Sequence, residues 1–179
     1  MNVKRVFACI CACASLAAYA GDISLDEFDA EVERLPVDEP TEQDPLSMNA
    51  TLVAADPGHG DPVIAVLKLK MAPGWYIYAD VPDSQPFIET DWILNADPSL
   101  EIIDDWAGPP STRHKDISSI RIHEAGRDGS VFFRELEVVA PGEGSASVEI
   151  GLRYQVCNPE FCLPPKTKTR TVSVDVAAD

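Results

Sequence analysis

The chain has 179 residues, with 30 acidic and 14 basic side chains and a formal net charge of −16. A charge of this sign argues against nucleic acid and anionic membrane surfaces as partners. The length suits one domain, which can bury a hydrophobic core without needing a disulfide or a metal to fold.

Residues 1–20 have the pattern of a cleaved secretory signal peptide. Two basic residues are followed by an apolar run too short to span a bilayer and by a small-x-small cleavage sequence that ends at Ala20. Neither Cys11 nor Cys13 fits a lipoprotein anchoring site. Cleavage would leave 12 basic and 30 acidic side chains, a net charge of −18. We expect the product to act outside the cytoplasm.

Residues 21–47 are predicted to form an acidic N-terminal arm. Ser24 and Glu27 match a capping box, and apolar residues at helical spacing predict a short amphipathic helix over 25–34, which Pro36 ends. Further prolines then predict an extended segment. We expect a loosely packed extension, with a docking arm as the functional alternative.

From Met48 onward, short alternating runs separated by Pro, Gly and Asp predict β-strands. The expected strands cover residues 49–54, 63–70, 75–79, 88–95, 100–106, 119–123, 131–139, 145–156 and 169–176. The run at 63–70 alternates as a half-buried strand does. Short strands with frequent turn signals and no long helical pattern predict an all-β sandwich or barrel for residues 48–179. No phosphate-binding loop, nucleophile elbow or HExxH motif occurs.

Cys157 and Cys162 are the two cysteines that would remain after cleavage. Cysteines in an oxidising compartment normally pair. Asn158-Pro159 between them predicts a turn at a hairpin tip, where two arms can bring the Cα atoms within disulfide range. Closing so short a loop removes only about 2 kcal/mol of unfolded-state entropy, against about 4.7 kcal/mol for a loop near 100 residues. The bond would be a weak staple, and spacing alone leaves structural and redox roles equally open.

Metal binding and nucleophilic catalysis are the other roles that thiols can have. A zinc or copper site with His59, His114 or His123 is disfavoured, because none of these histidines lies at a ligand spacing from the cysteines. A cysteine nucleophile of the protease type is disfavoured because the neighbouring cysteine would oxidise it.

The sequence around the cysteines resembles a known family. Residues 154–169, YQVCNPEFCLPPKTKT, resemble the cysteine segment of the N-terminal periplasmic domain of DsbD, the thiol:disulfide interchange protein. The shared features are the Tyr-Gln before the first cysteine, the short spacer, and the Leu-Pro-Pro after the second. Residues 72–78 resemble the family's Gly-aromatic-x-Tyr strand, and residues 35–39 its N-terminal segment.

The resemblance implies an immunoglobulin-like β-sandwich that works in the periplasm as a dithiol/disulfide relay without a cofactor, in pathways such as cytochrome c maturation. Its electron donor would be the thioredoxin-like domain of a membrane thiol reductase, and its clients would be periplasmic thioredoxin-fold proteins. The family's membrane conduit and thioredoxin-like domain do not follow here, so we expect the donor to be a separate protein. Neither nucleic acid nor membrane insertion is implied.

The resemblance also implies roles for individual residues. Cys162 would form the mixed disulfide and Cys157 would resolve it. A cap of two acidic residues and an aromatic is implied at Asp104, Asp105 and Trp106.

Two further aromatic residues are candidates for the site. Core packing is the expected role of the aromatics at 75–78, with Tyr78 the best candidate to line the site, and Phe161 and Leu163 would present Cys162 on an apolar patch suited to docking. The alternative reading is a non-enzymatic immunoglobulin-like binding module, in which the Cys157–Cys162 disulfide is structural.

Overall fold

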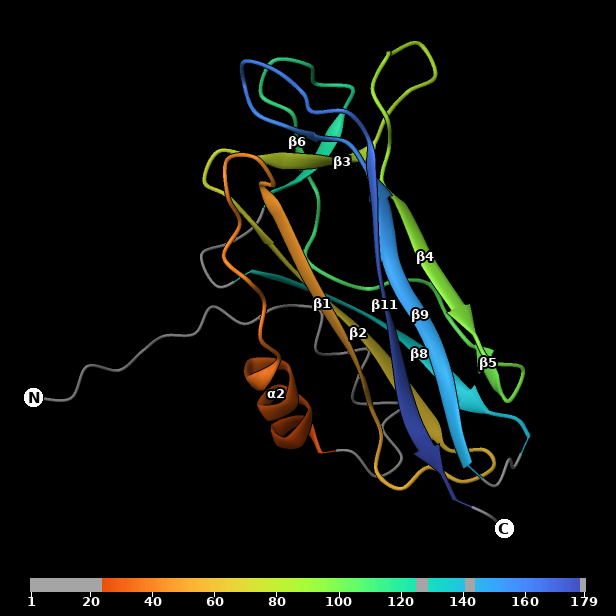
Figure 1. Cartoon of the computed structure of the whole chain (residues 1–179). Coiled ribbons are helices and arrows are strands. Elements are labelled where there is room, and N and C mark those ends of the chain that lie inside the picture. The colour runs from red at the N-terminus through yellow and green to blue at the C-terminus, as the bar shows by residue number, and fades with distance from the viewer. Residues whose placement is uncertain (1–23, 125–128, 141–143, 178–179) are drawn as a thin grey trace, which may run out of the picture.

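Three antiparallel sheets and one helix make up the computed structural model, which describes residues 24–124, 129–140 and 144–177 (Figure 1). One sheet has the strand order β1 (Leu46–Val53), β2 (Pro62–Met71), β8 (Ser130–Val138) and β5 (Leu100–Ile102). A second has the order β11 (Lys166–Val176), β9 (Gly144–Tyr154) and β4 (Asp91–Ala96). A third, smaller sheet has the order β10 (Val156–Cys157), β3 (Tyr76–Asp80), β7 (Arg121–Glu124) and β6 (Thr112–Arg113).

The first two sheets face each other across one hydrophobic core, which confirms the predicted all-β sandwich. Alternate residues of β2 and β8, such as Leu67, Leu69 and Leu136, meet Ile150 and Leu152 of β9, and all five are wholly buried. Burying one such side chain contributes about 1.5–3 kcal/mol. The small sheet lies across one end of the sandwich, where Figure 1 labels β3 and β6.

Several strand boundaries differ from those predicted. The expected strand 145–156 is two strands, because the chain leaves the β9 sheet after Tyr154 and Val156 pairs with Ile77 of β3 instead. The expected strand 100–106 ends at Ile102, and the two-residue β6 was not predicted. Periodicity reports which face of a strand is apolar, but it carries no information on which neighbour accepts the hydrogen bonds.

The N-terminal arm is packed onto the sandwich, so the expectation of a loose extension is wrong. Its helix α2 (Leu25–Arg34) begins with the predicted Ser24–Glu27 capping box. Phe28 is 7% exposed and packs with Ile64 and Val66 on the outer face of the first sheet. Strand β2 is therefore buried on both faces over residues 63–67. The prediction of a half-buried strand is wrong for these residues.

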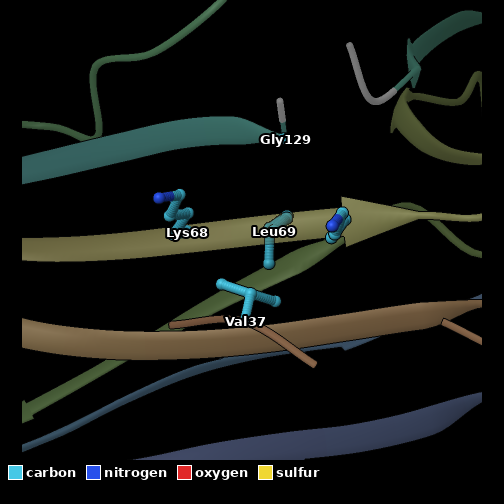
Figure 2. A pocket seen from close by; sticks show the side chains of 5 residues that line it. Val37, Lys68, Leu69 and Gly129 are labelled. Carbon is cyan, nitrogen blue, oxygen red and sulfur yellow. The ribbon is translucent and has the colours of Figure 1, made fainter. Parts of the chain in front are cut away.

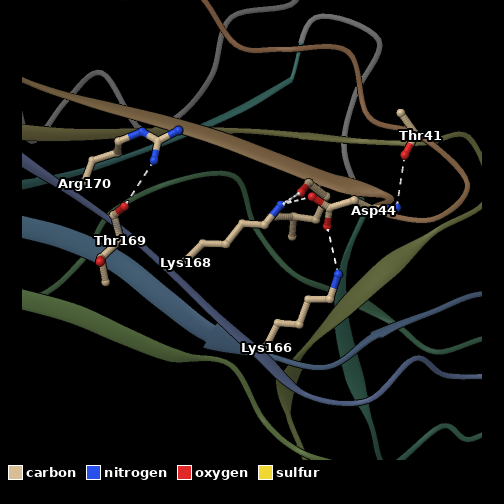
Figure 3. Close-up of polar contacts among 7 residues, drawn as sticks. Thr41, Asp44, Lys166, Lys168, Thr169 and Arg170 are labelled. Atoms are coloured by element: carbon tan, nitrogen blue, oxygen red, sulfur yellow. Dashed lines mark hydrogen bonds and ion pairs between the residues drawn. The ribbon is translucent and has the colours of Figure 1, made fainter.

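Polar contacts tie the rest of the arm to the sheets. Lys68 of β2 donates hydrogen bonds to the carbonyl oxygens of Val32 (2.8 Å) and Leu35 (3.2 Å) at the end of the helix. Asp44 accepts from Lys166 at 3.3 Å and from Lys168 at 2.6 Å, both on β11 (Figure 3). The arm is thus held to β2 of the first sheet and to β11 of the second.

The predicted signal peptide lies outside the described residues. The one helix of the described segments, α2, is neither long nor apolar enough to cross a membrane.

Candidate functional site: the Cys157–Cys162 disulfide

Cys157 and Cys162 form a disulfide across a tight turn between β9 and β11. The two Cα atoms are 4.0 Å apart, and the two residues form an antiparallel bridge. The Asn158 side-chain oxygen accepts hydrogen bonds from the backbone N–H groups of Glu160 and Phe161, both at 2.9 Å. The predicted Asn158-Pro159 turn is therefore present, stabilised by the local side-chain hydrogen bonding that favours Asn at turns.

The two cysteines differ in exposure. Cys157 ends β10, pairs with Tyr76 of β3, and is 0% exposed. Cys162 lies beyond the turn and is partly exposed. Of the two residues, Cys162 alone therefore has surface exposed to a thiolate from another protein.

Aromatic side chains surround the disulfide. Tyr76 and Tyr78 of β3 point to the same face and belong to one cluster with both cysteines. The Tyr78 hydroxyl lies 3.7 Å from the Cys162 sulfur. Phe87, from the loop between β3 and β4, stacks on Tyr78 with ring centroids 4.8 Å apart. These rings cover the disulfide on the side of the small sheet.

The hydroxyl of Tyr78 stays protonated over the physiological pH range. Burial raises its pKa far above the usual value, and the neighbouring Tyr76 raises it further. Because Cys162 is the sulfur nearest this hydroxyl, Tyr78 can donate a hydrogen bond to a Cys162 thiolate when the disulfide is reduced. Hydrogen bonding to the charged form lowers the pKa of a thiol.

His114 and Tyr76 form a second polar contact beside the turn. The His114 Nε2 atom lies 2.9 Å from the Tyr76 hydroxyl, which also lies 3.4 Å from the backbone oxygen of Asn158. The pKa of Tyr76 is raised by burial, although the nearby Tyr78 hydroxyl opposes the shift. The loop that holds His114 and the cysteine turn therefore meet at one tyrosine hydroxyl.

The acidic pair of the expected cap lies elsewhere. The Asp104 carboxylate accepts from the Glu135 N–H at 3.0 Å, and Asp105 lies 3.7 Å from the Arg134 guanidinium. Both partners belong to β8. Both aspartates are therefore engaged by β8, whereas Phe87 packs in the cluster that includes the two cysteines.

Trp106, the aromatic of the expected cap, packs at the edge of the main core. Its ring centroid lies 6.0 Å from that of Trp92, on β4. The buried indole N–H has no hydrogen-bond partner within the described part of the chain. Its contacts are those of ordinary core packing.

Phe161 is the exposed aromatic residue next to Cys162. The side chain is 51% exposed, directly before Cys162. It meets Trp75 edge-on, with ring centroids 5.5 Å apart. Exposed aromatic surface of this kind is typical of contacts with other proteins.

The histidines do not gather into a metal site. His59 is exposed in the loop between β1 and β2, and His123 packs against Trp92 and Phe132. Burial, aided by Arg121, lowers the pKa of His123. Within residues 24–124, 129–140 and 144–177, no group of three or more potential ligands is arranged to hold a metal ion.

A small surface pocket lies between the arm and β2, away from the disulfide. Figure 2 shows its lining residues, Val37, Lys68, Leu69, Lys70 and Gly129. Lys68 is bonded to carbonyls of the arm and Lys70 is paired with Glu39. With both ammonium groups already engaged, the pocket offers no set of groups for catalysis.

Phe87 and His114 are the two residues at the site that sequence reasoning missed. Phe87 stands in a Pro- and Ser-containing loop and His114 in another, and neither forms part of a recognisable motif. Pairing of β3 with β7 and of β7 with β6 places both loops beside the cysteine turn. Residue pattern alone could not supply that pairing.

Three solved structures are similar to this chain at low identity. The GAE domain of GGA2p from Saccharomyces cerevisiae is 9% identical, with 76% of this chain and 96% of that chain covered and a TM-score of 0.40. The yeast GGA1 GAE domain is 9% identical, with coverages of 77% and 97% and a TM-score of 0.40. The N-terminal domain of DsbD from Neisseria meningitidis, in the reduced form, is 18% identical, with coverages of 73% and 84% and a TM-score of 0.37. These likenesses are too distant to inform on function.

No curated protein matches the chain significantly. The family described as "Thiol:disulfide interchange protein DsbD, N-terminal" matches residues 42–174. The match includes both cysteines, the turn between them and the strands that position them. Because it spans most of the sequence, the chain belongs to the family of DsbD N-terminal domains.

Proposed function

We propose that this chain exchanges thiols and disulfides in the periplasm through Cys157 and Cys162. The observation that supports this most directly is the unequal exposure of the two cysteines, with Cys162 open to a partner and Cys157 buried. Family membership points the same way, because DsbD N-terminal domains are periplasmic and work with thioredoxin-like partners.

The disulfide form accepts two electrons from a donor dithiol, which we propose is the thioredoxin-like domain of a membrane thiol reductase. A donor thiolate attacks the Cys162 sulfur, the Cys157–Cys162 bond breaks, and Cys157 leaves as a thiolate that takes up a proton. The second donor thiolate then attacks the donor sulfur of the mixed disulfide. Cys162 is released, and the donor leaves with its own disulfide.

The reduced form passes the electrons to a client, which we propose is a thioredoxin-fold protein of the periplasm. The Cys162 thiolate attacks the client disulfide and forms a mixed disulfide, releasing one client thiol. Cys157 then attacks the Cys162 sulfur, which restores the intramolecular disulfide and releases the second client thiol. Cys162 is thus the residue that meets each partner.

The surrounding aromatics suit this sequence of steps. Tyr78 would donate to the Cys162 sulfur while it is a thiolate, and Phe87 would exclude small oxidants from the same side. Phe161 and Trp75 would provide the apolar contact for docking. An incoming partner must displace little to reach Cys162, since that residue is already partly exposed.

Single-cysteine variants test the assignment of roles. C157S leaves Cys162 and should trap abundant mixed disulfides with thioredoxin-fold proteins from periplasmic extract. C162S leaves the wholly buried Cys157 and should trap few. The measurement is non-reducing gel electrophoresis with mass spectrometry of the adducts, and the double variant C157S/C162S is the control.

The reduction potential separates this function from a binding module with a structural bridge. Structural disulfides of secreted proteins lie below about −300 mV. We expect the Cys157–Cys162 pair to lie above that limit when equilibrated with a glutathione or dithiothreitol buffer. A potential below it, together with equal and negligible trapping by both single variants, would favour the binding module.

A further inference from the structure

We propose that His114 is a positioning residue for the Cys157–Cys162 turn and that it acts through the hydroxyl of Tyr76. The inference rests on the proposed function and deepens it, because it concerns how readily the pair re-forms its disulfide. His114 precedes the short segment 115–119 and belongs to none of the motifs that identify the family.

The hydrogen bonds of His114 determine which ring nitrogen bears the proton. Its Nδ1 atom lies 3.2 Å from each of the backbone nitrogens of Asp116 and Ile117, which both donate to it. An atom that accepts two N–H groups holds no proton, so the proton of the neutral ring resides on Nε2. The ring therefore faces Tyr76 as a donor.

The direction of the next contact follows from this tautomer. Nε2–H donates to the Tyr76 oxygen across 2.9 Å, with the two ring centroids 5.2 Å apart. A phenol has one proton, and with its oxygen accepting from His114 that proton is available to the Asn158 carbonyl at 3.4 Å. Each group thus donates to the next: the His114 ring donates to the Tyr76 hydroxyl, and that hydroxyl donates to the Asn158 carbonyl of the turn.

Asn158 is the residue whose position matters for re-forming the disulfide. It directly follows Cys157, and its side chain holds the turn that returns the chain to Cys162. In the disulfide form the S–S bond itself closes the turn. After reduction, hydrogen bonds and side-chain packing do so, and the Tyr76 contact is a hydrogen bond that reaches the turn from β3. Holding the turn closed keeps the two sulfurs near each other and raises their effective concentration.

The test measures the equilibrium constant for disulfide formation in the full chain with reduced and oxidised glutathione. In this reaction the protein dithiol and one glutathione disulfide give the protein disulfide and two glutathione thiols. H114N keeps an oxygen where Nδ1 accepts the two backbone N–H groups but removes the donor to Tyr76. Y76F removes the hydroxyl and keeps the ring. H114Q returns an N–H donor, and H59N is the matched control at an exposed histidine.

We expect H114N and Y76F each to lower the equilibrium constant for disulfide formation, by up to about fivefold, the effect of one neutral hydrogen bond that is lost on reduction. The double variant should lower it no further, because both changes break the same chain of contacts. H114Q should recover most of the loss, and H59N should match the parent chain.

Three results would overturn the proposal. One is an equilibrium constant for disulfide formation in H114N equal to that of H59N. Another is a double variant in which the fold-change of this constant is the product of the two single fold-changes. The third is an equal loss of thermal stability in the oxidised and reduced forms with an unchanged constant, which would make His114 a purely structural residue of its loop. The parent chain's own constant tests the proposed function separately, since the proposal depends only on ratios between variants.

Discussion

At the scale of single residues, burial decides how the two sulfurs differ. Cys157 is wholly buried because β10 pairs with β3, which turns its side chain inward beside Tyr76 and Tyr78. Cys162 follows the turn and is partly exposed. The two residues of one disulfide therefore differ in exposure, although they are separated by only 5 positions.

Tyr78 is the residue best placed to change the acidity of Cys162. Y78F removes the hydroxyl that lies 3.7 Å from the sulfur and should raise the pKa of the Cys162 thiol by about one unit, the scale of one hydrogen bond to a charged group. The measurement is the pH dependence of iodoacetamide alkylation in the reduced C157S background. Y154F, which alters a buried tyrosine of β9, is the control. Superimposable profiles for Y78F and Y154F would contradict the prediction.

At the scale of elements, Gly151 allows β9 and β11 to pair beside the cysteine turn. A Cβ atom on Gly151 would lie 2.0 Å from the Lys168 carbonyl oxygen and 2.8 Å from the Thr169 Cα, both on β11. Backbone atoms cannot move aside as a flexible side chain can. The glycine is therefore required by close approach of the strands.

We expect G151A to lower the free energy of unfolding by about 1–3 kcal/mol, the usual cost of overpacking. G58A is the control, because a Cβ there would meet its nearest atom at 3.5 Å, an ordinary contact. Urea denaturation of the oxidised protein measures both variants. A loss for G151A no larger than that for G58A would show that the strands adjust freely.

Helix α2 packs more closely onto the sandwich than the sequence predicted. F28A should lower the free energy of unfolding by about 3 kcal/mol, because Phe28 is 7% exposed and packs against β2 and Phe133 of β8. L25A, on the same helix but 46% exposed, should change it little. Comparable unfolding midpoints for the two variants in urea would mean that the helix is not part of the cooperative fold.

At the scale of the whole molecule, Asp44 connects the arm to the last strand through Lys166 and Lys168 (Figure 3). Burial alone would raise the pKa of Asp44, but the hydrogen bonds and charges of Lys168 and Lys166 outweigh it and lower the pKa below its usual value of 3.8. A carboxylate with a lowered pKa stabilises the folded state at neutral pH. That contribution is lost as the pH falls through the pKa of the folded form.

D44N should therefore lower the free energy of unfolding at pH 7, by at most about 1 kcal/mol for a pair this exposed. The difference from the parent chain should shrink steadily once the pH falls below 3.8. D38N, at an exposed aspartate of the same arm, is the control. Thermal unfolding followed across the acid range measures all three proteins, and a difference that does not depend on pH would contradict the role given to the carboxylate.

The all-β sandwich expected from the sequence is confirmed for the molecule as a whole. Its elements could be predicted where a local pattern exists: the capping box of α2, the alternation in β9, and the Asn-Pro turn. Boundaries failed where neighbours decide the pairing, as at Tyr154, where the chain changes sheets. The covering of β2 by α2 was missed for the same reason, because a contact between distant segments has no local signature.

The sequence by itself determined the family of this protein and favoured the pairing of its two cysteines, because the turn that holds Cys157 and Cys162 has a recognisable local sequence. Only the tertiary structure decided what surrounds them. It set Tyr78 against Cys162, brought Phe87 and His114 from separate loops, and left Asp104 and Asp105 in contact with Glu135 and Arg134 of β8. The reason is physical: a disulfide's environment is made by strand pairing and side-chain packing between residues far apart in the chain, and neither leaves a trace in residue spacing.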